Sequence, residues 1–552
     1  MELKAARREN VLKHYAASES ENKLKFMEGD KKATSEYIYP NQKEDAFNIM
    51  NQYYEHKRRV VSVVKKTKVG ADGLMIELTK QMTTHLDDEF VVDPANVRIL
   101  TGMSNEKWEK DMKEKAPECF KKKIFHHGQL KRAELRGLRD ALIIIDELDT
   151  GDKECQVLHN QLKESGVLNV QYMEENNIRF LFISATMVKE LYHLYKWGDL
   201  HHLYRMTIPE TYIGHTEFLQ RNIIREFYPL NTDENVDKWI KEDIVENYLN
   251  DFRIHIVRST LKNASSIQDG CIRNGIECRN HTSSDKIDDS QLRRLFEDPL
   301  SGHVVLLVKG FFRRANLIPN EWKLRIGAVH ELYTKVVDNN VQIQGLPGRM
   351  TGYWRNVIEN GYKTGPYRTS ITAVKQYEQS YLDPFGENSY QCSGFKKKKG
   401  KVTLIDPTIV AAKNIEGLRP CEGPVSSDPE DDIDPKKNVP IVIPMTIDEI
   451  ERVHKLPTYK KRNILRELLK QYLRENNRTA LADRLDEFDV RQITRPGTES
   501  SRKKNIDDTV NAARRNQSYC INININYRDK NSWQGILDDR DNRVIFILYC
   551  DP

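Results

Sequence analysis

Short apolar runs rich in β-branched residues recur over the first 330 residues, and segments with helical spacing separate them. One group of runs lies near residues 60, 98, 144 and 182, and a second group lies near residues 255, 306 and 329. Continuous apolar runs of this length are typical of strands buried on both faces of a parallel sheet, with helices as crossovers. The two groups therefore predict an α/β chain with two tandem lobes, each built on a parallel sheet.

The sequence also predicts where these lobes begin and end. Residues 1–35 are polar and predict an N-terminal arm, the lobes occupy residues 36–205 and 206–395, and a stretch rich in lysine, proline and acid predicts a linker over 396–440. Beyond it, helical periodicity is followed by "CINININY", in which Ile and Asn alternate as in a strand. We expect a small α+β domain over residues 441–552.

Composition constrains the partners only weakly. Lysine plus arginine (87) exceed aspartate plus glutamate (82) by only 5, so net charge alone is a weak argument for nucleic acid. No apolar run approaches the roughly 20 residues of a membrane span, and the opening "MELKAARREN" is charged rather than apolar. We expect no membrane partner and no secretion, with a location in the cytoplasm or in a virion.

The stretch "VVSVVKKTKVGADGLMIEL", residues 60–78, predicts a strand, a glycine turn and a helix, which is the outline of a phosphate-binding loop (P-loop). In the pattern GxxxxGK[ST], lysine neutralises phosphates and a hydroxyl binds magnesium. Here Gly70 matches, but Lys65 replaces the first glycine, Ala71 the lysine and Asp72 the hydroxyl residue. A carboxylate at a helix N-terminus also takes the amides that a phosphate would use, so nucleotide binding should be weak.

Two substitutes keep an active site open as a hypothesis. Lys66 or Lys68 could reach the phosphates from another part of the turn, and Asp72 could bind magnesium directly in place of the hydroxyl.

A second motif supplies carboxylates. The apolar strand in "LIIIDELD" ends on Asp146 and Glu147, where an aspartate could hold magnesium and a glutamate could orient the attacking water. An acidic turn after a strand is the simpler alternative. Another apolar strand ends 38 residues after Asp146 in Ser184, Ala185 and Thr186.

The order and spacing of "DELD" and "SAT" resemble those of the superfamily 2 (DEAD/DEAH-like) helicases, in particular the helicase-like proteins of large nucleocytoplasmic DNA viruses, here with a degenerate Walker A motif. The resemblance covers about residues 37 to 390. It implies two RecA-like lobes, coupling of the nucleotide site to nucleic acid through Ser184 and Thr186, and recognition of the adenine edge by Gln42.

Two segments of the second lobe extend the resemblance. "NVQIQGLPGRMTGY" is similar to the helicase motif QxxGRxxR, which implies roles for Gln344 and for Arg349 as an arginine finger, although a simple Gly/Pro turn is the alternative. "VLLVKGFFRRANLIP" stands where helicases carry their fifth motif, so Lys309, Arg313 and Arg314 are expected to face phosphate or nucleic acid.

Together these features predict a helicase-like protein that binds DNA or RNA and has impaired or lost ATP hydrolysis. ATP and magnesium are expected cofactors only if the site is active, and otherwise none. One alternative is an active helicase or translocase with an unusual P-loop, and another is a virion structural or packaging protein whose C-terminal domain contacts a protein partner. The residues predicted to contact nucleotide are Gln42, Lys68, Gly70, Ala71 and Asp72, and those predicted to act in hydrolysis are Asp146 (with Mg²⁺), Glu147, Gln344 and Arg349.

Overall fold

The computed structural model divides the chain into two compact units, residues 1–426 and 427–552. The residues that it describes are 2–30, 33–87, 91–154, 156–260, 263–282, 285–312, 318–386, 395–398, 401–404, 408–421, 441–444, 458–475, 482, 489–492, 520–526 and 543–548.

The first lobe is built on a sheet that is parallel throughout, with the strand order β3-β2-β4-β5-β1-β6. Its strands are β1 (Val60–Val64), β2 (Arg98–Thr101), β3 (Ile124–Phe125), β4 (Ala141–Asp146), β5 (Ile178–Ser184) and β6 (His201–Arg205). Because successive strand residues point to opposite faces, each strand supplies two apolar cores. Val61 and Val63 enter one core, whereas Val60 and Val64 enter the other.

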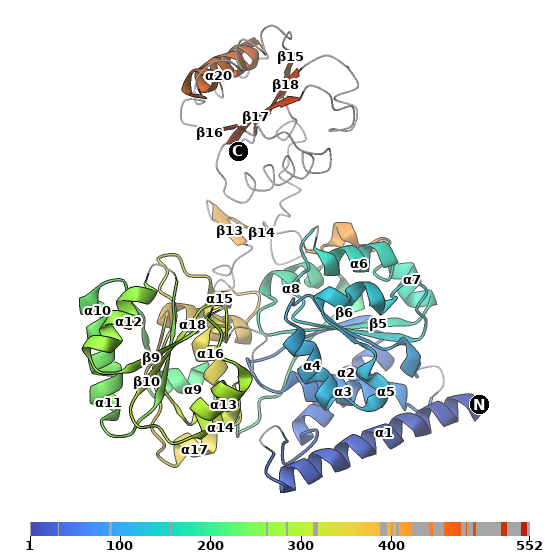
Figure 1. The fold of residues 1–552 in the computed structure, drawn as a ribbon. Helices are drawn as coiled ribbons and strands as arrows, with labels where there is room; N and C mark the ends of the chain where they lie inside the picture. Colours follow the sequence, from blue (N-terminus) through green and yellow to red (C-terminus); the bar gives the residue numbers. More distant parts are fainter. Residues whose placement is uncertain are drawn as a thin grey trace. The chain divides into compact units, whose positions relative to one another are not determined.

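Helices cover both faces of this sheet, as Figure 1 shows, with α2 to α5 on one side and α6 to α8 on the other. The N-terminal helix α1 packs on the first side through Val11 and Tyr15, so much of the predicted arm is a helix. The helices are α1 (Glu2–Met27), α2 (Pro40–Tyr54), α3 (Ala71–Thr83), α4 (Glu106–Lys115), α5 (Glu118–Lys121), α6 (Val157–Ser165), α7 (Val170–Glu175) and α8 (Val188–Tyr195).

The second lobe repeats this architecture with the strand order β7-β12-β11-β8-β10-β9, again parallel throughout. Its strands are β7 (Ile224–Glu226), β8 (Ile254–Arg258), β9 (Glu277–His281), β10 (Val304–Val308), β11 (Ile326–His330) and β12 (Tyr367–Thr369). Its helices are α9 (His215–Gln220), α10 (Asp233–Trp239), α11 (Glu246–Tyr248), α12 (Ala264–Arg273), α13 (Asp289–Glu297), α14 (Asn320–Lys323), α15 (Asn339–Ile343), α16 (Leu346–Met350), α17 (Arg355–Glu359) and α18 (Ile371–Leu382). The predicted fold class, two tandem RecA-like lobes with parallel sheets, is confirmed.

Residues 408–421 follow the second lobe in sequence but pack on the first. Ile409 and Val410 are fully buried in the core beside α6 to α8. The indole Nε1 of Trp197 donates to the Val410 carbonyl at 2.9 Å, and the Ile409 amide donates to the Asp152 carbonyl at 3.0 Å. Part of the segment predicted as a linker therefore belongs to the core of the first lobe.

The unit formed by residues 427–552 combines a sheet with a helix. The sheet has the order β15-β18-β17-β16, in which β17 pairs antiparallel with β18 and parallel with β16. The segment "CINININ" forms β17, as its alternation predicts. The bounds are β15 (Ile441–Pro444), α20 (Thr458–Glu475), β16 (Asp489–Gln492), β17 (Cys520–Asn526) and β18 (Arg543–Leu548). Across the described residues of both units, no helix has the length and apolarity needed to cross a membrane.

Candidate functional site

The P-loop turn, residues 65–70, connects the carboxyl end of β1 to the first residue of α3, Ala71. Gly70 has a φ of +88°, a left-handed conformation that favours glycine. A Cβ atom at Gly70 would lie 2.6 Å from Gln42 Nε2 and 3.1 Å from the Tyr353 hydroxyl. The predicted strand, turn and helix are present, and protein atoms cover the turn.

Gln42 lies in the first turn of α2 and contacts this turn. Its Nε2 donates to the Gly70 carbonyl at 2.7 Å, and its Oε1 accepts from the Tyr39 amide at 2.9 Å. The Tyr39 ring is stacked on the Tyr353 ring, with 5.3 Å between centroids and 9° between planes. The nitrogen and the oxygen of the Gln42 amide, which was predicted to recognise adenine, are therefore both hydrogen-bonded to the protein's own backbone.

The two carboxylates at the end of β4 are almost fully buried, with Asp146 4% and Glu147 6% exposed. Lys65 Nζ lies 3.5 Å from Asp146 Oδ1 and 3.0 Å from Glu147 Oε1. The indole Nε1 of Trp108 donates to Asp146 Oδ2 at 2.8 Å, and Ser184 Oγ lies 3.0 Å from Glu147 Oε2. Each of the four carboxylate oxygens therefore has a protein donor.

These contacts shift the pKa values of the groups. Burial raises the pKa of Asp146 to about 6, against the attraction of Lys65 and with the repulsion of Glu147. Burial disfavours the charge on Lys65, but Asp146 and Glu147 outweigh it and raise the pKa of the ammonium group. Lys65 is therefore held as a cation between the two carboxyl groups.

Asp149, the last residue of "DELD", joins this motif to the strand β5. Ser184 Oγ lies 2.9 Å from Asp149 Oδ1, and Thr186 Oγ1 donates to Asp149 Oδ2 at 2.8 Å. Since Ser184 has one hydroxyl proton, Glu147 and Asp149 share it as a donor. The two predicted coupling residues therefore meet the "DELD" motif directly.

The second lobe contributes residues to the same region. Arg349, on α16, is fully buried, and its Nη2 donates to Gln344 Oε1 at 2.7 Å. Two residues further on, Thr351 Oγ1 donates to the Thr67 carbonyl at 2.8 Å, and the Tyr353 hydroxyl donates to the Val69 carbonyl at 2.6 Å. The segment that resembles the QxxGRxxR motif therefore lies on the P-loop turn.

The charged residues proposed as substitutes in the P-loop have different environments. Lys66 Nζ pairs with Glu378 Oε2 of α18 at 2.5 Å, and Asp72 pairs with Lys115. Burial disfavours ionisation of Asp72, but Lys115 outweighs it and lowers the pKa of the carboxyl group. For Lys68, no hydrogen bond or ion pair is found within the described part of the chain, and burial, assisted by Arg349, lowers its pKa.

The remaining predicted residues lie as follows. Ala71 is buried and offers no polar side-chain group at the position of the P-loop lysine. Lys309 is half-buried and follows β10, and its amide donates to the His281 carbonyl at 3.4 Å. Arg313 and Arg314 lie outside the described residues.

Sequence reasoning did not identify several residues of this site as functional. Asp149 could have been identified from the sequence, since it completes the motif "DELD". Lys65 could also have been identified, because it directly follows β1, and the carboxyl ends of β1 and β4 lie at the same edge of one parallel sheet. Trp108, Thr351 and Tyr353 could not have been identified, because their roles depend on contacts between distant segments.

The resemblance implies ATP and Mg²⁺, and the contacts of the site determine whether its residues could hold them. Mg²⁺ binds oxygen ligands at 2.0–2.1 Å in near-octahedral geometry, but Lys65 and Trp108 present donors to both oxygens of Asp146. Tyr353 and Gln42 cover the turn that would receive phosphates. The residues as arranged do not fit Mg²⁺, and side chains from α2 and the second lobe pack directly on the turn.

Comparison with protein-family models finds no match, and no curated protein is matched. Solved structures with a similar arrangement include S. cerevisiae Dbp5 variants. One, bound to Gle1 and IP6, has 13% identity and a TM-score of 0.34, and the match covers 63% of this chain and 91% of that one. Another, bound to RNA and ADP BeF3, has 12% identity and a TM-score of 0.34, covering 63% and 92%. The Escherichia coli DEAH/RHA helicase HrpB has 12% identity and a TM-score of 0.36, covering 62% of this chain and 47% of that one.

Proposed function

We propose that this chain is a superfamily 2 helicase-like protein that binds nucleic acid and whose ATP hydrolysis is impaired or lost. The observation that carries the proposal is the covered P-loop turn, where Gln42 and the Tyr353 hydroxyl lie over Gly70. A P-loop binds phosphate through the backbone amides of its turn and the helix N-terminus, and here side chains from α2 and the second lobe are bonded to the carbonyls of that same turn.

The charges support the same conclusion. Hydrolysis requires a cation on the β- and γ-phosphates and a metal ion held by carboxylates. Ala71 provides no cation, and Lys65 already forms ion pairs with Asp146 and Glu147. Arg349 is bound to Gln344 rather than free to meet a transferring phosphoryl group.

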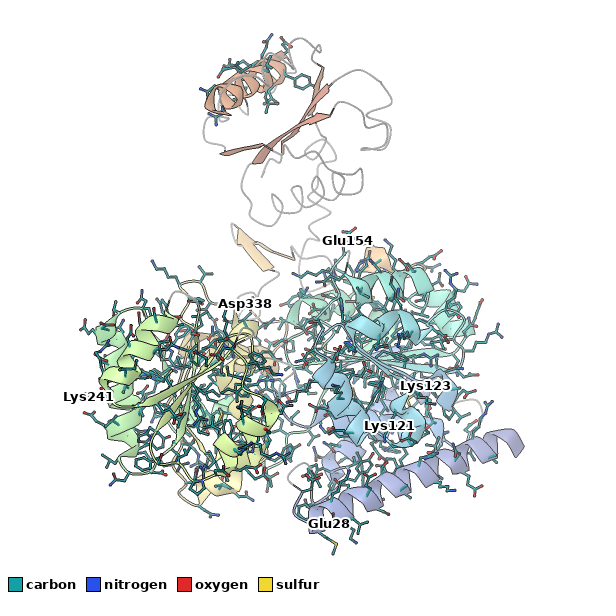
Figure 2. All side chains as sticks on the ribbon, in the orientation of Figure 1. Glu28, Lys121, Lys123, Glu154, Lys241 and Asp338 are labelled. Carbon is teal, nitrogen blue, oxygen red and sulfur yellow. The ribbon has the colours of Figure 1, made fainter. Side chains whose placement is uncertain are left out.

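Nucleic-acid binding is supported by two features of the first lobe, a contact between motifs and a basic segment. The contact of Asp149 with Ser184 and Thr186 joins "DELD" to the motif that the resemblance associates with coupling to nucleic acid. The segment 119–139 adds exposed basic side chains, which suit a phosphate backbone. Lys121 and Lys123 of this segment are labelled near each other in Figure 2. The exposed basic residues are Lys122, Lys131, Arg132, Arg136 and Arg139.

The motif set of residues 37–390 supports placing the protein among the helicase-like proteins of large DNA viruses, in the cytoplasm or in a virion. A second candidate, an active enzyme with an unusual P-loop, is favoured by one observation. Lys68 is buried in the turn and forms no ion pair within the described residues, and the positive charge of Arg349 disfavours its ionisation. An anion bound there would favour the charged form of Lys68.

Purified protein should be tested for binding to single-stranded DNA and RNA over a range of salt concentrations, and for ATP hydrolysis with and without nucleic acid. We expect binding that weakens as salt increases and no stimulated hydrolysis. Changing Lys131 and Arg132 together to Ala should weaken binding and reduce its salt dependence. Lys241→Ala, an exposed lysine on the second lobe (Figure 2), is the control. Absence of binding at low salt would contradict the proposal, and hydrolysis stimulated by nucleic acid would favour the second candidate.

A further inference from the structure

We propose that Lys65 is a built-in counter-ion that takes the place of a divalent metal ion between Asp146 and Glu147. The inference deepens the proposed loss of hydrolysis and rests on it. Lys65 Nζ approaches one oxygen of each carboxylate, at 3.5 and 3.0 Å, from the residue that directly follows β1.

The other oxygen of each carboxylate also lies within hydrogen-bonding distance of a protein donor. Trp108 directs an N–H at Asp146 Oδ2, and the Ser184 hydroxyl lies beside Glu147 Oε2. A donor hydrogen and a metal ion compete for the same lone pairs, so a cation entering here would displace protein contacts on both carboxylates. The pair is organised for an ammonium group rather than for a metal ion.

Electrostatics reinforces this arrangement. Lys65 is only 11% exposed and the two carboxylates less so, and charges in such a poorly solvated site interact strongly. A divalent ion would bring two further positive charges next to the ammonium group of Lys65. Because Lys65 is attached to the chain beside the site, its ammonium group is present there at a high effective concentration and no ion from solution is needed.

The other carboxylate near the turn does not provide a metal ligand either. Asp72, at the position where the P-loop pattern has its magnesium-binding hydroxyl, forms an ion pair with Lys115 of α4. Lysines therefore occupy both places from which the family pattern would bind the metal.

Variants that lack the ammonium group of Lys65 should acquire affinity for a divalent ion. Removal of the ammonium group leaves two adjacent buried carboxylates without their cation, which is destabilising. A divalent ion carries the missing charge and prefers carboxylate oxygens. Lys65→Met should therefore create a metal site that the wild-type protein does not have.

The test uses the full chain with Mn²⁺ as a paramagnetic probe for binding and Mg²⁺ for thermal stability. We expect the wild-type protein to show the same melting temperature in chelator and in Mg²⁺, and to bind Mn²⁺ at least about tenfold more weakly than Lys65→Met. The variant should melt at a lower temperature in chelator and recover part of the loss in Mg²⁺. Adding Asp146→Asn to Lys65→Met should abolish both the binding of Mn²⁺ and the recovery of the melting temperature in Mg²⁺.

Two controls separate charge from packing. Lys65→Arg keeps the charge and should bind no Mn²⁺. Lys66→Met removes another buried lysine, but its partner is the single carboxylate of Glu378, so Mg²⁺ should restore nothing.

Mn²⁺ binding by the wild-type protein that a folded Asp146→Asn variant lacks would overturn the inference, whether or not Lys65→Met folds. A folded Lys65→Met that binds no Mn²⁺ would also overturn it. ATP hydrolysis, measured on the same samples, reports separately on the proposed function. A wild-type protein that binds Mn²⁺ but does not hydrolyse ATP contradicts the inference alone.

Discussion

Thr351 of the second lobe donates its hydroxyl to the backbone carbonyl of Thr67 in the P-loop turn, at 2.8 Å. Tyr212 donates to the same carbonyl at 2.7 Å. A backbone carbonyl has two lone pairs, and here Tyr212, which packs in the core of the first lobe, and Thr351 of the second lobe both direct hydroxyl groups at them. The hydroxyl of Thr351 also lies 2.9 Å from the Gly348 carbonyl. The turn that the sequence suggests as a phosphate site therefore binds two distant segments of the chain. Tyr212 is 145 residues from Thr67, and Thr351 is 284 residues from it.

The shared carbonyl predicts that the two donors are not energetically additive. Either Thr351→Val or Tyr212→Phe leaves the Thr67 carbonyl with one partner and should cost about 1 kcal/mol of unfolding free energy. The double variant leaves that buried carbonyl without either donor and should cost about 3 kcal/mol, more than the sum. Urea unfolding of all four proteins measures the coupling.

Tyr333→Phe, at a partly exposed tyrosine of the second lobe, is the control and should change stability little. Strict additivity of the two losses would contradict the shared acceptor.

The covered turn predicts that repairing the P-loop sequence alone does not restore nucleotide binding. The double variant Ala71→Lys, Asp72→Thr supplies the missing lysine and hydroxyl, but Tyr353 still lies over Gly70. We expect the double variant to bind ATP no better than the wild-type protein. Adding Tyr353→Ala should increase the affinity by about tenfold or more, since it removes both the hydroxyl and the ring stacked on Tyr39.

Equilibrium binding of a fluorescent ATP analogue measures these affinities, with Tyr353→Ala in the wild-type background as the control. Tight binding by the double variant alone would show that the side chains over the turn move aside readily.

The sequence predicted those parts of the fold whose signal is local. Buried strands such as Ile143 to Ile145 are recognisable because their apolar residues are contiguous, and Gly70 because its turn requires a left-handed residue. The pairing of Lys66 with Glu378 was not predictable, because 312 residues separate them and neither has a periodic pattern. The packing of Ile409 on the first lobe was missed for the same reason.

In the site, too, the motifs with a local sequence pattern were predicted and the contacts between distant residues were not. "DELD" and "SAT" were found as motifs, and the structure brings Asp149 to Ser184 and Thr186. The role of Lys65 was missed, since a lysine after a strand is ordinarily solvated, and only the converging sheet edges bring it to Glu147.

The ion pair between Lys66 and Glu378 predicts a measurable link between the P-loop turn and α18. Lys66 also lies over the Tyr381 ring, 4.0 Å from its centroid. Either Lys66→Met or Glu378→Gln should cost about 3 kcal/mol, because each leaves a largely buried charge without its partner. The double variant should be more stable than the less stable single variant. Chemical denaturation of the four proteins tests this, and losses that simply add would contradict the pairing.

Acid should destabilise the protein through His330, which lies at the end of β11 and is 1% exposed. Burial lowers its pKa to about 3, which the hydrogen bond to the Glu331 carbonyl opposes and the nearby Arg368 reinforces. The rings of Tyr228 and Trp239 pack edge-on against it and carry no charge.

The unfolded chain protonates this histidine near pH 6.5, whereas the folded chain does not until about pH 3. Between these values the unfolded state binds more protons, so stability is lost as pH falls through the window. The contribution of His330 at about pH 5 is a loss of roughly 2 kcal/mol. The His330→Gln variant should have an unfolding free energy that falls less steeply between about pH 7.5 and pH 5, as measured by urea unfolding at each pH. Equal slopes for the two proteins would mean that His330 has the same pKa in the folded and unfolded chains, in conflict with its burial beside Arg368.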